Sequence, residues 1–165
     1  MSYETETLAE IIERLGLERH VEGGWFRETY RSEETVECPD RENSTRSLLT
    51  TIHYLLDDNE PIGLIHRNRS DIIHFHEGGG VLEYLTLSPD GELTDHLIGP
   101  GYDRQLIVPG GYWKATRLLD GEWGMVGEAV SPGFDFLDME IDDGSWIKAN
   151  FPQHYDRLKP YFKKT

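Results

Sequence analysis

The sequence predicts a single all-β domain, folded as a sandwich or barrel, with a helix near each end. Short stretches of strand-like alternation recur roughly every 8–12 residues along most of the chain. Pairs of turn-forming residues such as Pro-Gly and Asp-Gly separate these stretches. The length of 165 residues suits one domain, so we treat residues 1–165 as a unit.

A helix is expected at the start of the chain, before the strands. Thr5 or Thr7 can cap its N-terminus, and Gly16 can end it. Its apolar residues follow the spacing i, i+3, i+4 and i+7, which forms one stripe along a helix. These residues are Leu8, Ile11, Ile12 and Leu15.

Strands are expected over most of the remaining chain. They span residues 25–32, 48–56, 72–76, 81–87, 93–98, 105–108, 112–119 and 123–130. A further short strand is expected to end near His66-Arg67. Ser88–Gly91 and Asp120-Gly121 predict hairpin turns, and residues 33–43 predict a polar loop. Pro152 can begin a short final helix.

The charge balance restricts the partners of the protein. The chain has 16 basic and 31 acidic residues, a net charge of −15, which repels nucleic-acid phosphates and anionic membranes. No apolar run approaches the ~18 residues of a membrane span, and the acidic start of the chain does not resemble a secretory leader. Cys38 is the single cysteine, so an intrachain disulfide and a cysteine-based zinc site are impossible. We expect a cytoplasmic protein that binds neither nucleic acid nor membrane, in an ordinary or a salt-rich cytoplasm.

The tripeptide His74-Phe75-His76 is the sharpest local signal. Residues two apart on a strand share a face, so the two imidazoles are expected to point the same way. Together they could bind a metal or a polar ligand, and His66 could complete a three-histidine site suited to zinc, nickel or iron. The alternative is a histidine pair on a solvated sheet face.

The segment Gly23–Tyr30 is also dense in residues that can bind ligands. Its glycines could admit a ligand or a second backbone, and Arg27 could bind an anion through two hydrogen bonds. The alternative is an edge strand with Trp25 and Phe26 packed at a subunit contact.

Together these residues resemble the cupin signature. His74-x-His76 corresponds to its first motif, Gly91 to the turn between its strands, and Pro109-Gly110-Gly111 to the turn of its second motif. Within the cupins the chain is similar to the cupin-5 group, through residues 20–32, 51–56, 66–76, 108–111 and 130–136. The resemblance implies a cupin double-stranded β-helix (jelly roll), a ligand pocket inside the barrel, and a homodimer that exchanges N-terminal strands.

The chain departs from the metal-binding cupins at the ligand positions. Gly80 or Val81 stands where those cupins have a glutamate, and Lys114 stands at the place of the third histidine. A lysine cation would repel a divalent ion. We therefore expect no cofactor. The alternative is a divalent metal held by His66, His74 and His76.

Three functions are compatible with the sequence. Because the cupin-5 group resembles the dTDP-4-dehydrorhamnose 3,5-epimerases in fold, the first is a metal-independent isomerase or epimerase that acts on a sugar or sugar nucleotide by acid/base chemistry. The second is a non-catalytic module that binds a small polar metabolite, and the third is a metal-dependent oxygenase, isomerase or lyase. The candidate catalytic residues are His66, His74, His76 and Tyr54. The candidate ligand-binding residues are Glu22, Phe26, Arg27, Gln105, Trp113, Lys114 and Phe134.

Overall fold

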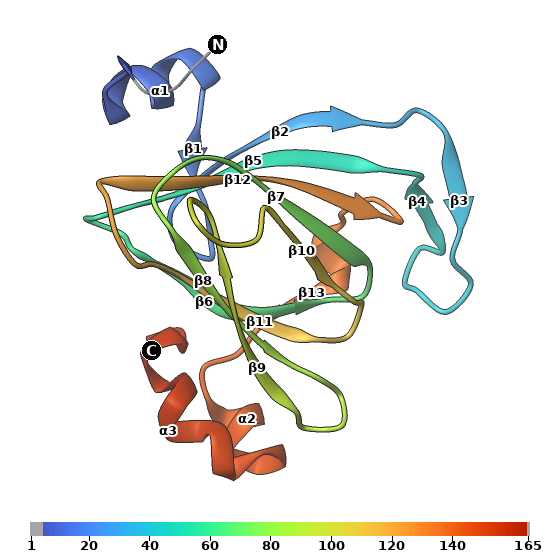
Figure 1. Ribbon diagram of the computed structural model, residues 1–165. Coiled ribbons are helices and arrows are strands. Elements are labelled where there is room, and N and C mark those ends of the chain that lie inside the picture. The colour runs from blue at the N-terminus through green and yellow to red at the C-terminus, as the bar shows by residue number, and fades with distance from the viewer. Residues whose placement is uncertain (1–4, 165) are drawn as a thin grey trace.

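Two antiparallel sheets pack face to face in the computed structural model, which describes residues 5–164 (Figure 1). The six-stranded sheet has the order β1 (Glu18–Arg19), β2 (Trp25–Arg31), β5 (Thr50–Asp57), β12 (Trp123–Ser131), β7 (Asp71–Gly79) and β10 (Gln105–Val108). The five-stranded sheet has the order β13 (Met139–Ile141), β6 (Ile62–Asn68), β11 (Trp113–Leu118), β8 (Leu82–Leu87) and β9 (Leu93–Ile98). This arrangement confirms the expected all-β jelly roll.

Helix α1 (Leu8–Leu15) forms where the apolar stripe predicts it. The side chain of Thr7 accepts a hydrogen bond from the backbone of Glu10, and the Glu10 carboxylate bonds back to Thr7 in a capping box. Gly16 ends the helix in the left-handed conformation, with a φ of 61°. The buried face of α1 packs against Leu55 and Met125, so this helix covers part of the outer face of the six-stranded sheet.

The chain ends in a short helical segment that packs on the five-stranded sheet. It comprises α2 (Ser145–Asn150), η3 (Pro152–His154), α3 (Tyr155–Leu158) and η4 (Lys159–Tyr161). Ile147, Leu158 and Tyr161 are buried against Leu85 and Trp113 of the sheet. Figure 1 shows this segment and α1 on different sides of the sandwich. No helix in residues 5–164 has the length and apolar character to cross a membrane.

Side chains that point inward from both sheets make the central core. Tyr54 and Val126 come from one sheet, and Leu82, Tyr84 and Leu118 come from the other. Because side chains alternate along a strand, each strand gives every second residue to this core. Toward the end of the sandwich where Ile72 and Val130 lie, the inward residues leave a cavity.

Two local predictions need correction. Residues 33–43 are expected to form a loop, but β3 (Thr35–Glu37) lies within them and pairs with β4 (Thr45–Ser47). Asp120-Gly121 is expected to form a hairpin turn, but it joins β11 in one sheet to β12 in the other, so it is a corner of the barrel. The predicted turn at Ser88–Gly91 does form the β8–β9 hairpin.

Candidate active site in the barrel

A cavity of about 320 Å³ opens between the two sheets. This volume lies at the small end of the roughly 300–1,000 Å³ of small-molecule sites. Polar side chains and aromatic rings share its wall. The lining residues are His20, Glu22, Phe26, Glu28, Arg31, Ile52, Tyr54, His66, Asn68, Ile72, Glu128, Val130, Phe134, Asp135 and Phe136.

A carboxyl–imidazole pair forms one part of the wall. Glu22 follows β1 and is buried, and His66 points inward from β6 and is buried as well. The Oε2 atom of Glu22 lies 3.3 Å from Nε2 of His66. The other ring nitrogen of His66, Nδ1, lies 2.8 Å from the carbonyl oxygen of Leu64, so Nδ1 carries the proton and donates it. Nε2 therefore presents a lone pair to Glu22.

The environment favours the neutral form of both groups. Burial raises the pKa of Glu22 to about 8, because water no longer solvates the carboxylate. Burial and then the charge of Lys114 lower the pKa of His66 to about 3. A protonated carboxyl group facing the lone pair of Nε2 is the arrangement that satisfies both groups.

A second buried polar cluster lies next to this pair. Lys114 on β11 is buried, and its ammonium donates to Nε2 of His74 on β7, at 2.6 Å. The same ammonium lies 3.5 Å from Oε2 of Glu128 on β12. His74 Nε2 is also 3.4 Å from Oε1 of Glu128. Glu128 lines the cavity, whereas Lys114 and His74 are not among the lining residues.

The pKa of Glu128 moves in the opposite direction from that of Glu22. Burial is the largest effect on Glu128 and would raise its pKa, but the charge of Lys114, together with the nearby imidazoles of His74, His66 and His20, outweighs burial and lowers the pKa to about 2. Burial and the charge of Lys114 also lower the pKa of His74 to about 3. Of the two buried carboxyl groups on the cavity wall, Glu22 is thus a neutral acid and Glu128 a carboxylate, a division that acid/base enzymes use.

Two rings flank the Glu22–His66 pair. The hydroxyl of Tyr54 donates to the carbonyl oxygen of Gly23, at 2.9 Å. Burial raises the pKa of Tyr54 well above its usual value, so its proton stays in this bond. His20 packs edge-on against Phe26, with 4.4 Å between ring centroids, and its Nδ1 accepts from the backbone amide of Glu22.

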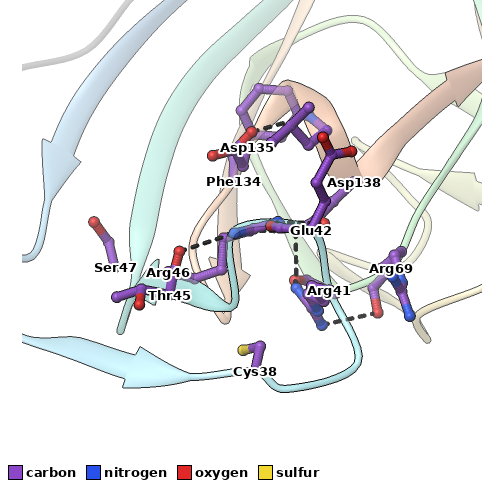
Figure 2. A network of polar contacts seen from close by, with 12 residues as sticks. Cys38, Arg41, Glu42, Thr45, Arg46, Ser47, Arg69, Phe134, Asp135 and Asp138 are labelled. Atoms are coloured by element: carbon purple, nitrogen blue, oxygen red, sulfur yellow. Dashed lines mark hydrogen bonds and ion pairs between the residues drawn. The ribbon is translucent and has the colours of Figure 1, made fainter.

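The loop after β12 forms the mouth of the cavity, and buried ion pairs fix the end of this loop. Phe134 and Phe136 lie edge to face, 5.0 Å apart, and both line the cavity. The short helix η2 (Phe136–Asp138) ends this loop. The buried Asp138 carboxylate accepts from Arg46 at 2.8 and 2.9 Å and from Arg41 at 3.0 Å (Figure 2). The β3–β4 hairpin region therefore holds the mouth loop in place.

Five of the residues predicted to form the site line the cavity: Glu22, Phe26, Tyr54, His66 and Phe134. Two others, His74 and Lys114, belong to the buried cluster that includes Glu128. The structure does not bring the remaining four predicted residues, His76, Arg27, Gln105 and Trp113, to the cavity wall.

Strand alternation explains two of these four placements. Arg27 follows the inward Phe26 on β2, so it points outward, where it is exposed and donates to the carbonyl oxygen of Leu15. Trp113 precedes the inward Lys114 on β11 and packs outward against Trp146, 5.2 Å between centroids. Neighbouring residues on a strand cannot both face the barrel.

His76 and Gln105 also lie away from the cavity, each in different surroundings. His76 is two residues beyond His74 on β7, where Nε2 lies 3.0 Å from the carbonyl oxygen of Gly80 and Nδ1 lies 3.2 Å from Arg104. Gln105 is exposed at the start of β10.

The residue that sequence reasoning missed most clearly is Glu128. A signal was present, because Glu128 has the same strand parity as Val126 and Val130 in an otherwise apolar strand. A single carboxylate on the buried face of a strand requires a partner. Asn68 and Asp135, which also line the cavity, carry no comparable signal.

These residues do not fit a divalent metal ion. Within residues 5–164, no three His, Cys, Asp or Glu side chains converge in an arrangement able to hold one. His74 Nε2, the atom that would face a metal, instead accepts a hydrogen bond from Lys114. A metal would have to displace this ammonium or share its place, and like charges so close repel strongly in a buried site.

Comparisons with known proteins agree with this architecture. The family model described as "Cupin superfamily (DUF985)" matches residues 9–142. The uncharacterized protein YML079W of Saccharomyces cerevisiae is 37% identical in an alignment 148 positions long that covers 80% of this chain and 73% of the yeast protein.

Solved structures give the same picture. Protein SO0799 from Shewanella oneidensis has a TM-score of 0.86 at 31% identity, over 98% of this chain and 100% of that one. A hypothetical protein from Leishmania major has a TM-score of 0.86 at 28% identity, over 96% and 100% of the two chains. Oxalate decarboxylase from Bacillus subtilis, at 17% identity and a TM-score of 0.58 over 89% of this chain and 37% of that one, shares the fold alone.

The two-sheet barrel with a polar cavity inside it defines a cupin-fold protein. More specifically, the chain belongs to the DUF985 family of the cupin superfamily.

Proposed function

We propose that the protein is a metal-independent isomerase or epimerase that transfers a proton at a carbon atom next to the carbonyl group of a sugar-like substrate. The observation that carries the proposal is the Glu22–His66 contact of 3.3 Å on the cavity wall. Since His66 presents a lone pair there, Glu22 is held as a carboxylic acid that is ready to give up its proton.

Glu22 and Glu128 take complementary roles in this reaction. Glu22 gives its proton to the carbonyl oxygen of the substrate while the Glu128 carboxylate takes the proton from the adjacent carbon. The product of this half-reaction is a neutral enediol, with Glu22 ionised and Glu128 protonated. For an isomerase, Glu128 then gives its proton to the other carbon of the enediol, and the hydroxyl group on the first carbon gives its proton to Glu22 and becomes the new carbonyl. For an epimerase, the proton returns to the opposite face of the same carbon. Either route restores both groups, so charge is conserved throughout.

Three further residues support this chemistry without exchanging protons with the substrate. His66 accepts the hydrogen bond that orients the Glu22 proton. Lys114 and His74 fix the position of Glu128 and keep it ionised. Groups held in place by buried partners need little rearrangement during the reaction, which lowers its barrier.

Solvent isotope exchange tests the proposal. Pentoses, hexoses and 4-keto sugar nucleotides are incubated in D2O with the protein, and loss of the carbon-bound proton signal is followed by NMR. We expect exchange with at least one compound, reduced about 10²-fold or more in Glu22→Gln and in Glu128→Gln. Glu140→Gln, which alters an exposed carboxylate on β13, is the matched control and should keep the wild-type rate.

Exchange that persists undiminished in both glutamine variants would contradict the assigned roles. A compound that binds in the cavity without exchanging its protons would indicate a binding protein instead of an enzyme.

A further inference from the structure

We infer that the site selects an uncharged substrate and rejects compounds that carry phosphate. This inference rests on the proposed function for its choice of substrate, and it narrows the sugar or sugar-nucleotide class to the free sugar. The observation behind it is that the protein's own carboxylates already hold the cations at the cavity.

Arg31 is the cation at the mouth, and Glu28 occupies its hydrogen-bonding edge. Nε and Nη2 of Arg31 each lie 2.8 Å from one carboxylate oxygen of Glu28, a two-pronged contact. Nη2 also donates to the carbonyl oxygen of Phe134, at 3.1 Å. A phosphate group prefers the same edge of a guanidinium. To bind here, it would have to displace a carboxylate that lies on the same strand, three residues away.

Lys114 is the buried cation near the cavity, and its ammonium is also already paired within the protein. Its ammonium contacts Glu128 and His74, and Lys114 is not among the residues that line the cavity. A phosphate approaching from the cavity would meet the Glu128 carboxylate first. Arg27, which the sequence made a candidate for anion binding, points out of the barrel.

The remaining formal charge at the cavity is negative. Asp135 at the mouth adds a carboxylate to those of Glu28 and Glu128, and Arg31 is the one cation among the described lining residues. A chain with a net charge of −15 adds a repulsive field. Placing an anion beside like charges in a partly buried site is costly.

The other features of the wall suit a neutral polyhydroxy compound. Carboxyl groups of Glu22 and Glu128 and the amide of Asn68 can exchange hydrogen bonds with hydroxyl groups. Phe26, Phe134 and Phe136 provide apolar faces for the carbon–hydrogen surface of a ring. A volume of about 320 Å³ leaves little room for a nucleotide in addition to a sugar.

Inorganic pyrophosphate is the probe that tests this inference, because it carries the charge of a sugar nucleotide without its bulk. Binding is followed by the NMR shifts of the Phe134 and Asp135 amides, which lie at the mouth. We expect the wild-type protein to show no saturable shift at millimolar concentrations. Glu28→Gln, which frees Arg31, should bind the probe saturably, with a Kd at least tenfold below the lower limit set by the wild-type titration.

The matched control is Asp95→Asn. Asp95 on β9 forms an exposed ion pair of comparable length, 3.0 Å, with Arg157 on α3. This variant should bind pyrophosphate no better than the wild type. Saturable binding at the mouth of the wild-type protein would overturn the inference, and so would a Glu28→Gln variant that gains no affinity. The experiment measures binding alone, so a failure of isotope exchange would refute the proposed function and leave this result unaffected.

Discussion

Glu22 Oε2 and His66 Nε2 lie 3.3 Å apart, and the hydrogen bond from His66 Nδ1 to Leu64 decides which of the two carries the proton. Because the imidazole already donates through Nδ1, its Nε2 can only accept unless the ring becomes a cation. Burial of both groups disfavours the ion pair of a histidinium and a carboxylate. Glu22 is therefore protonated at neutral pH, and His66 is neutral.

The proton on Glu22 predicts how stability depends on pH. The folded protein keeps the Glu22 proton up to a pKa of about 8, whereas the unfolded chain releases it near 4.5. The stabilisation from this group is complete below pH 4.5 and is lost as pH rises through about 8. Relative to Glu22→Gln, which does not titrate, the wild-type free energy of unfolding should fall by up to ~1.4 kcal/mol per pH unit in this window.

Urea unfolding of both proteins at several pH values between 4.5 and 8 measures this difference. Glu140→Gln, at an exposed carboxylate paired with Arg67, is the control and should show no comparable slope. A wild-type-minus-variant difference that stays constant, or rises with pH, would be inconsistent with a protonated Glu22.

Removal of the Lys114 charge should destabilise the fold. Lys114→Met leaves Glu128 and its carboxylate buried without a cation, which costs roughly 3–5 kcal/mol. The double variant Lys114→Met, Glu128→Leu removes both charges and should recover most of this loss. Chemical denaturation of the three proteins at pH 7 makes the comparison. If the single and double variants were equally stable, the ion pair would not carry the energy assigned to it.

The anchor of the mouth loop gives a third prediction. Asp138→Asn weakens the contacts of the buried Arg46 and should cost roughly 3 kcal/mol. The loop should also open more often, because Arg46 and Arg41 tie it to the β3–β4 region. Hydrogen exchange should therefore become faster at the Leu137 and Asp138 amides.

Asp40→Asn is the matched control for this variant, since Asp40 pairs with Arg69 in an exposed contact nearby. It should change the free energy of unfolding by less than ~1 kcal/mol. Unchanged amide exchange at the mouth loop of Asp138→Asn would show that the arginine contacts do not hold it.

A fourth prediction concerns acid. Burial and the charge of Lys114 lower the pKa of both His66 and His74 to about 3, from 6.5 in the unfolded chain. Each neutral ring contributes stability that is present above pH 6.5 and is lost as pH falls through about 3. His66→Asn, which keeps a hydrogen-bonding side chain, should therefore lose less stability than the wild type between pH 6.5 and 4. Denaturation at these two pH values tests this, and equal losses would contradict it.

The fold was predictable because local signals agree with the tertiary structure. The capping box, apolar stripe and terminal glycine of α1 act within one helix, and strand alternation with Pro-Gly turns marks most of the strands. The composition of residues 35–37 does not predict β3. These residues form a strand because they pair with β4, which lies later in the sequence. The turn at Asp120-Gly121 was misread because local sequence does not state whether the next strand pairs or crosses to the other sheet.

The candidate site was predictable in part. The candidates Glu22, Tyr54 and His66 do line the cavity. Strand alternation alone shows that Phe26 and Arg27 must point to opposite faces of their strand, and so must Trp113 and Lys114. The pairings that set the charge of each group join distant strands. Lys114, for example, meets Glu128 from the opposite sheet, and no spacing rule within one strand predicts that contact.

A titration of the Glu22 carboxyl group tests most directly whether Glu22 can donate a proton at neutral pH. With glutamate labelled at the side-chain carboxyl carbon, NMR can follow the titration of the Glu22 signal, which is assigned by its loss in Glu22→Gln. We predict a midpoint near pH 8, and a signal typical of a neutral carboxyl group at pH 6. A midpoint at or below the usual value of 4.5 would mean that Glu22 is a carboxylate at neutral pH and has no proton to donate.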